Sequence, residues 1–260
     1  MRKLIWGFVL LVFGLVGSAK AHFLWLNPWA YHLDTGEDLR LTLGFGHNFP
    51  GPGGDFLEAS YLKTLFLWGP EGTRVDLKTG KYPILFKSPS VLEKEGTYLL
   101  VAAKKPGFFS KTATGFARKP KNELSDVIEC KYSKRYAKAL ITVGKPGGKA
   151  YQKVIGHELE IIPLKDPYLL RVGDGLPVKI LYQGRPLAKT WVLATYEGFS
   201  PTGHQTYFSF ASRTNRRGET VIRLDHRGVW LIFVSHQEPY PQPDVCDVST
   251  AVATLTFELR

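Results

Sequence analysis

The sequence contains few of the residues that build soft-ligand metal sites or disulfide-rich miniproteins. Only two of its 260 residues are cysteine, and its single methionine is Met1. Two cysteines are too few for a small scaffold held by disulfides, and one methionine excludes a methionine-rich copper site. CxxC, HExxH and GxSxG motifs and glycine-rich phosphate loops are all absent. The sequence therefore gives no sign of thiol redox, zinc-protease, serine-hydrolase or nucleotide-binding chemistry.

Long hydrophobic runs are also scarce, and the one that exists lies at the start. Residues 4–16 are almost purely apolar, follow Arg2 and Lys3, and precede the small residues of segment 17–21. A run this short falls below the roughly 20 residues of a membrane-spanning helix. The pattern is typical of a secretory signal peptide, residues 1–21, that is cleaved after Ala21. A retained anchor helix is the alternative. Cleavage predicts a periplasmic or secreted protein that begins at His22.

Export would place Cys130 and Cys246 in an oxidising compartment, where disulfides form and persist. We therefore expect an intramolecular disulfide between them, with thiolate metal ligation as the alternative. The formal net charge is +11, and the first 21 residues hold three cations and no carboxylate, which leaves the mature chain at +8. Lysine and arginine are dispersed, as in residues 131–135, and this favours a solvated basic surface and no nucleic-acid partner.

The patterning predicts a mostly β protein. Residues 39–43 alternate apolar and polar as a half-buried strand does, and 26 glycines with 17 prolines favour strands and turns. We expect two β-sandwich-like domains: an N-terminal β-rich domain over residues 22–150 and a C-terminal sandwich over 156–260. One helix is expected over residues 122–139, from the spacing of Leu124, Val127, Ile128, Tyr132 and Tyr136.

The C-terminal domain is predicted to be immunoglobulin-like or prealbumin-like, because seven short strands with glycine and proline turns fill about 100 residues. The seven predicted strands cover residues 158–162, 176–181, 191–196, 206–210, 220–224, 229–234 and 250–259.

Three of the seven histidines are candidate metal ligands. His22 would become the terminal residue, so its α-amine and imidazole would form a bidentate chelate. His47 lies between glycines and prolines on a constrained loop after a strand, which holds an imidazole at little entropic cost. His236 follows a strongly apolar strand, and strand ends are rigid platforms for sites.

The other histidines are weaker candidates. His157 begins a strand and His204 lies in a loop, whereas His32 and His226 are expected to be exposed turn residues. Asp55 and Glu58 offer an oxygen ligand or a contact that orients an imidazole; a solvated loop is the simpler interpretation of both.

The order of several short motifs resembles a family of exported bacterial proteins that are described as periplasmic components of nickel or cobalt uptake systems. These motifs are residues 21–25, 44–50, 159–164 with 166–167, Gly218 with 228–232, and 253–259. The resemblance implies a nickel- or cobalt-binding protein with His22 and His47 as ligands, and it extends less firmly to His236.

We therefore expect a non-enzymatic periplasmic protein that binds Ni²⁺ or Co²⁺, with Cu²⁺ or Zn²⁺ as further ions, and passes the ion to a membrane uptake transporter. Two alternatives remain open. One is an oxidative enzyme in which a copper ion held by the terminal histidine cleaves polysaccharide, with Trp25, Trp29 and Tyr31 lining its surface. The other is a structural or adhesive sandwich protein without a metal.

Overall fold

The fold is mostly β, as predicted, in a computed structural model that describes residues 22–47, 49–50, 57, 59–78, 86–88, 92–200 and 208–260. Its strands are β1 (Phe23–Pro28), β2 (His32–Leu33), β3 (Leu39–Gly46), β4 (Leu62–Trp68), β5 (Arg74–Asp76), β6 (Phe86–Ser88), β7 (Gly96–Lys104), β8 (Gly107–Thr112), β9 (Gly115–Ala117), β10 (Val127–Val143), β11 (Leu159–Pro163), β12 (Gly175–Tyr182), β13 (Arg185–Pro186), β14 (Trp191–Tyr196), β15 (Phe210–Arg213), β16 (Glu219–Arg223), β17 (Gly228–Pro239) and β18 (Val248–Leu259). Four 3₁₀ turns cover Ala59–Tyr61, Lys121–Glu123, Ala150–Gln152 and Pro167–Leu169. Among these residues, no helix is long and apolar enough to span a bilayer.

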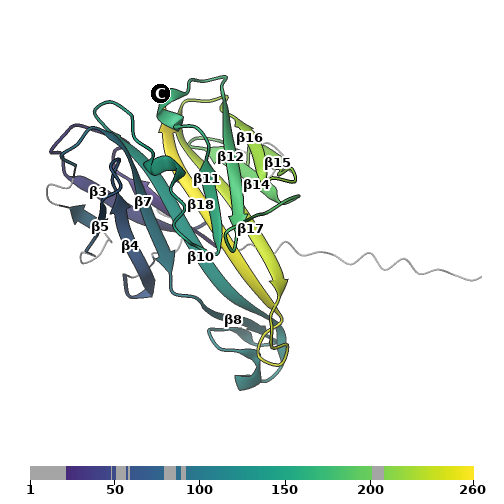
Figure 1. Ribbon diagram of the computed structural model, residues 1–260. Coiled ribbons are helices and arrows are strands. Elements are labelled where there is room, and N and C mark those ends of the chain that lie inside the picture. Colours follow the sequence, from purple (N-terminus) through teal and green to yellow (C-terminus); the bar gives the residue numbers. More distant parts are fainter. Residues whose placement is uncertain are drawn as a thin grey trace, which may run out of the picture.

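Three sheets form the layers of the molecule (Figure 1). The central sheet has the strand order β15-β14-β17-β18-β10-β7-β4-β5, and β2 and the β8–β9 hairpin join it along β10. A sheet of β1, β3 and β6 packs on one face, where it contributes to one hydrophobic cluster. A sheet of β11, β12, β13 and β16 packs on the other face, where it contributes to another.

The central strands are buried on both faces, so they lack the simple alternation of a half-exposed strand. Residues 96–103 of β7 are all buried, and so are residues 249–257 of β18. In β10, Ala137 and Ala139 face the core under β1, whereas Leu140 faces the core under β11 and β12. This explains the nearly continuous apolar run of residues 98–103 in β7.

The helix predicted over residues 122–139 is wrong. The segment forms a 3₁₀ turn at Lys121–Glu123 and then the 17-residue strand β10. This strand pairs antiparallel with β7 and β8 and parallel with β18. A partner strand on one edge or the other pairs with β10 along nearly its whole length, which outweighs a helix-like spacing of apolar residues.

The central sheet takes strands from both sides of the boundary predicted near residue 150. β4, β7 and β10 come from the first segment, and β14, β17 and β18 from the second. The division into two domains stays a prediction. The strand predicted over residues 206–210 lies partly outside the described residues, and β15 begins at Phe210.

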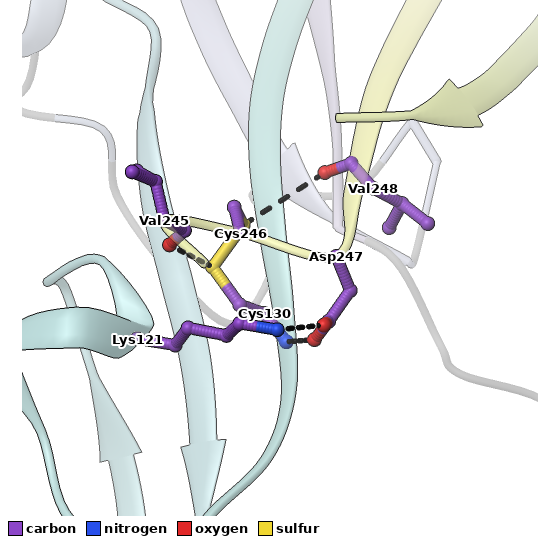
Figure 2. Close-up of polar contacts among 6 residues, drawn as sticks. All are labelled: Lys121, Cys130, Val245, Cys246, Asp247 and Val248. Atoms are coloured by element: carbon purple, nitrogen blue, oxygen red, sulfur yellow. Dashed lines mark hydrogen bonds and ion pairs between the residues drawn. A yellow bond between two sulfur atoms is a disulfide. The ribbon is translucent and has the colours of Figure 1, made fainter. Parts of the chain in front are cut away.

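The expected disulfide between Cys130 and Cys246 is present (Figure 2). It ties β10 to the segment that leads into β18. Next to it, Asp247 accepts a hydrogen bond of 2.7 Å from the Cys130 amide and forms an ion pair of 2.5 Å with Lys121. Lys121 also donates its amide to the Val245 carbonyl at 2.9 Å. Covalent and polar links therefore hold this end of β10 in place.

Candidate functional site

The pairing of β1 with β3 sets the candidate site. The two strands run antiparallel, with Phe23 opposite Gly46 and Trp25 opposite Gly44. Extending this register by one residue places His22 opposite His47. Their ring centres are 4.7 Å apart, with an angle of 64° between the ring planes. The structure therefore brings together two of the three histidines that were predicted to bind metal.

A glycine makes room for the indole that fixes this register. Trp25 is completely buried, and its ring lies across the backbone of Gly44. A Cβ atom at Gly44 would lie 1.9 Å from Cε2 of that ring, far inside any normal contact. The glycine that precedes His47 by three residues therefore has a packing role, because only hydrogen fits beneath the indole.

β1 is also fastened to the central sheet beneath it. The hydroxyls of Thr254 and Thr256 donate hydrogen bonds to the carbonyls of Leu24 at 2.6 Å and Leu26 at 2.8 Å. Both threonines are buried, so these carbonyls have no access to bulk water as a substitute partner. β1 therefore has two supports: the strand β3 along one edge and a row of threonines below.

Arg135 of β10 holds the residue at which the mature chain would begin. Its Nε donates to the His22 carbonyl at 2.9 Å, and its Nη1 donates to the Lys134 carbonyl at 3.1 Å. The side chain is 8% exposed, and burial lowers its pKa to about 10. The surface interpretation of residues 131–135 is wrong for Arg135. Nothing in the local sequence marks it, because its role comes from β1, more than 100 residues away.

Two phenyl rings contact the histidine pair. Phe45 lies edge-on to His22, with ring centres 5.4 Å apart, and Phe23 lies edge-on to His47 at 6.2 Å. Phe23 in turn contacts Phe233 of β17 at 5.4 Å. Rigid rings on several sides restrict the rotamers of both imidazoles, which keeps the two rings close together.

The spacing of the two rings fits one shared metal ion. An imidazole nitrogen binds such an ion at about 2 Å, so its ring centre lies about 3.2 Å away. Two rings that share an ion at a right angle then have centres about 4.5 Å apart, close to the 4.7 Å between His22 and His47. Within the described residues, no group of three or more histidine, cysteine or carboxylate side chains could hold a metal ion. Cleavage after Ala21 would add the α-amine of His22 as one candidate for a third donor.

His236 does not join this pair. On β17, Phe233 packs with Phe23 on the side of β1, whereas Val234 lies in the core beneath β12. His236 lies two residues after Val234 and therefore on the same face of β17. Its ring centre lies 4.2 Å from that of Tyr182 on β12. Side chains alternate along a strand, so His236 faces the opposite side of the central sheet from His22 and His47.

The other histidines have local partners. His157 stacks on Tyr136 with ring centres 4.6 Å apart, and burial lowers its pKa to about 4. His32 is largely buried rather than exposed, and burial lowers its pKa to about 4 as well. His226 is exposed, as expected. The remaining candidates lie outside the described residues: His204, Asp55 and Glu58.

The fold and the site define a mostly β protein with a histidine pair at the ends of two neighbouring strands. Residues 19–238 match the model of a domain of unknown function, DUF4198, and the chain belongs to this family. A search of curated proteins finds no match.

Several solved structures align with most of the chain at low identity. They include the D0-D1 domain of intimin (12% identity, 90% of this chain and 97% of that chain, TM-score 0.22), murine CEACAM1b (8%, 91% and 98%, 0.21) and the Yersinia pseudotuberculosis adhesin InvE (12%, 92% and 61%, 0.21). At these TM-scores the likeness carries no argument about function.

Proposed function

We propose that the mature protein binds a divalent transition-metal ion, Ni²⁺ or Co²⁺, in the periplasm and passes it to a membrane uptake transporter. The ligands are the α-amine and imidazole of His22 and the imidazole of His47. The observation that carries this proposal is the 4.7 Å separation between the ring centres of His22 and His47. His22 is the residue that directly follows the predicted signal peptide.

The donor set suits this class of ions. Imidazole binds nickel, copper, zinc and iron well, and an amine next to an imidazole on one residue forms a chelate without ordering a second segment. Three nitrogens leave coordination positions for water, which permits the exchange that delivery requires. Affinity should follow the Irving–Williams order, so Cu²⁺ binds most tightly in vitro even where Ni²⁺ or Co²⁺ is the cargo.

The long-range charge of the protein does not favour cations. The mature chain carries a formal net charge of +8, and Arg135 is buried beside His22. Screening limits such repulsion to about 8–10 Å at physiological ionic strength. Binding therefore depends on the nitrogen donors, and it should weaken as pH falls, because protons compete for the amine and both imidazoles.

Calorimetric titration of the processed protein with Ni²⁺, Co²⁺, Cu²⁺ and Zn²⁺ tests the proposal. Mass spectrometry first confirms that the chain begins at His22. A matched protein carries one extra alanine before His22, which converts the amine to an amide. We expect the extension to weaken binding at least about tenfold, since it removes one of three donors. Unchanged affinity would refute the chelate.

Two further variants define the ligand set. His47→Ala should weaken binding by about tenfold or more, because it removes the second ring. His236→Ala is the control, because His236 lies against Tyr182 on the other face of the central sheet. The metal affinity of this variant should equal that of the unmodified protein. Equal losses in both variants would contradict the site. No binding heat from any of the four ions would favour the metal-free alternative.

The oxidative-enzyme alternative loses one of its supports. Trp25, Trp29 and Tyr31 were its candidates for lining a polysaccharide surface, but Trp25 is completely buried and Tyr31 is 4% exposed. Trp29, at 59% exposed, is the only one of the three that could contact a polymer. Incubation of the copper-loaded protein with reductant, peroxide and polysaccharide separates the two functions, and soluble oxidised sugars would favour the enzyme.

A further inference from the structure

The β8–β9 hairpin and the first part of β10 form an arm that extends beyond the stacked sheets (Figure 1). We define the arm as residues 105–133. β8 pairs with β10 on one side and with the short strand β9 on the other. One face of the arm is covered, since Phe108 packs against Tyr132 and Tyr240, with ring centres 4.9 and 5.9 Å away.

The opposite face of the arm carries exposed apolar side chains. Phe109 is 44% exposed and Phe116 is 67% exposed, and their rings stack with centres 5.0 Å apart. Elsewhere in the arm, Ile128, the unpaired residue at the irregularity between Val127 and Glu129, is 62% exposed. Phe116 and Ile128 are among the most exposed large apolar side chains of the described structure. A cluster of this kind marks an interaction site more often than a lone exposed side chain does.

The arm also carries cations, one of them beside the stacked rings. Lys111 lies two residues after Phe109 in β8, so the two side chains share one face of the strand. Lys111 also lies opposite Phe116 of β9. Lys105 and Lys111 are exposed and have no carboxylate partner among the described residues. Arg118 bonds the hydroxyl of Tyr61 rather than a carboxylate. Glu129 of β10 lies opposite Lys111 but forms its ion pair with Lys131, at 2.9 Å. Within the described residues, cations of the arm therefore remain without a carboxylate at ion-pair distance.

The arm is held rigidly in this position. The Cys130–Cys246 disulfide joins its base to the segment before β18, and Asp247 bonds both the Cys130 amide and Lys121 (Figure 2). A preorganised arm loses little conformational entropy when its tip meets a surface.

From this arrangement we propose that the arm docks the protein on an anionic phospholipid bilayer. Phe109 and Phe116 enter the boundary between headgroups and acyl chains, while Lys111 lies at the phosphate level. Phenyl rings flanked by cations are the combination that binds such surfaces, through apolar burial together with attraction to anionic lipid.

Vesicle sedimentation tests this proposal independently of any metal. The probes are vesicles of phosphatidylcholine alone and of phosphatidylcholine with phosphatidylglycerol, mixed with the full mature protein. We expect binding to the vesicles that contain phosphatidylglycerol, weaker binding to the neutral ones, and loss of binding at high salt. The double variant F109S/F116S should lower the partition coefficient at least about tenfold, since two phenyl rings no longer enter the interface.

Trp191→Ser is the matched control. Trp191 is 50% exposed and has the Arg213 guanidinium 4.5 Å from its ring, so it is another exposed aromatic beside a cation, far along the sheet on β14. Its removal should leave vesicle binding unchanged. Melting curves confirm that both variants fold. Equal binding by F109S/F116S and the unmodified protein would overturn the proposal, as would no binding to either vesicle. A third outcome is that the unmodified protein self-associates but does not bind vesicles, and that F109S/F116S abolishes the self-association. This outcome would show that a second copy of the chain covers the arm instead.

Discussion

Substitution of Gly44 by alanine should disturb the site without changing either histidine. The new methyl group would lie 1.9 Å from Cε2 of Trp25, whereas carbon atoms in contact are normally about 3.5–4.0 Å apart. The indole must therefore retreat by about 1.5–2 Å, or β1 must separate from β3. Trp25 has no exposed surface into which it could turn.

The expected cost follows from this overlap. Extra methylene groups in a packed core destabilise a protein by about 1–3 kcal/mol, and a ring that cannot move outward favours the upper end of that range. For a chain of this length, about 3 kcal/mol lowers the melting temperature by about 6–12 °C. Movement of β1 also carries His22 away from His47, so we expect metal affinity to fall about tenfold or more, as when a contact that orients a ligand is lost.

Thermal unfolding and metal titration of Gly44→Ala measure both effects. Gly107→Ala is the control, because a Cβ atom at Gly107 meets no atom within 4 Å, and it should change neither quantity. Trp25→Leu removes the ring that clashes, so the double variant should lose less stability than the two single variants together. A Gly44→Ala protein that melts and binds metal like the unmodified one would refute the packing argument.

Two other substitutions test the framework around the site. Glu160→Gln should destabilise the protein by about 3–5 kcal/mol at neutral pH, because it leaves the buried Lys138 ammonium, 2.6 Å away, without its partner. Burial alone raises the pKa of Glu160, but the Lys138 charge and hydrogen bonds hold it below its usual value. This stabilisation is therefore complete above about pH 5 and is lost as pH falls through the folded pKa of Glu160. Urea unfolding of both proteins from pH 7 downward should show the difference between their free energies of unfolding shrink. A difference that stays constant with pH would contradict the assignment. Thr254→Val keeps the shape of the side chain but removes the donor to the Leu24 carbonyl, at a cost of about 1–3 kcal/mol; urea unfolding with no change in midpoint would show that this anchor of β1 is dispensable.

The class of the fold was predictable, but β10 was not. Its sequence from residue 127 onward shows no clean alternation, because each of its faces is covered by a different sheet. Lys138 is buried as the partner of Glu160, and Tyr136 stacks on His157, while Ala137 faces β1. A polar side chain that is buried through a distant partner looks solvent-exposed in the sequence, so the remaining apolar residues happened to fall at helical spacing.

The fate of His236 shows a second limit. A strand sequence tells which residues share a face, but it does not tell which face meets a given partner. Phe233 and His236 are three residues apart, so they lie on opposite faces of β17. Phe233 lies on the same side of the central sheet as the histidine pair. Only the packing of Phe23 against Phe233 shows this, and the sequence does not reveal that contact.

The proximity of His22 and His47 depends on strand register. Each residue was identifiable as a candidate ligand on its own, one at a new terminus and one at the end of a strand. What unites them is the antiparallel pairing in which Trp25 lies over Gly44, and a shift of one residue would put every β1 side chain on the wrong face. Because His22 directly precedes Phe23, the first residue of β1, the predicted cleavage would leave a single residue beyond the paired strands. The freed amine would then belong to the same residue as the imidazole it must assist, and a cleavage site only a few residues earlier would replace that amine with a peptide bond.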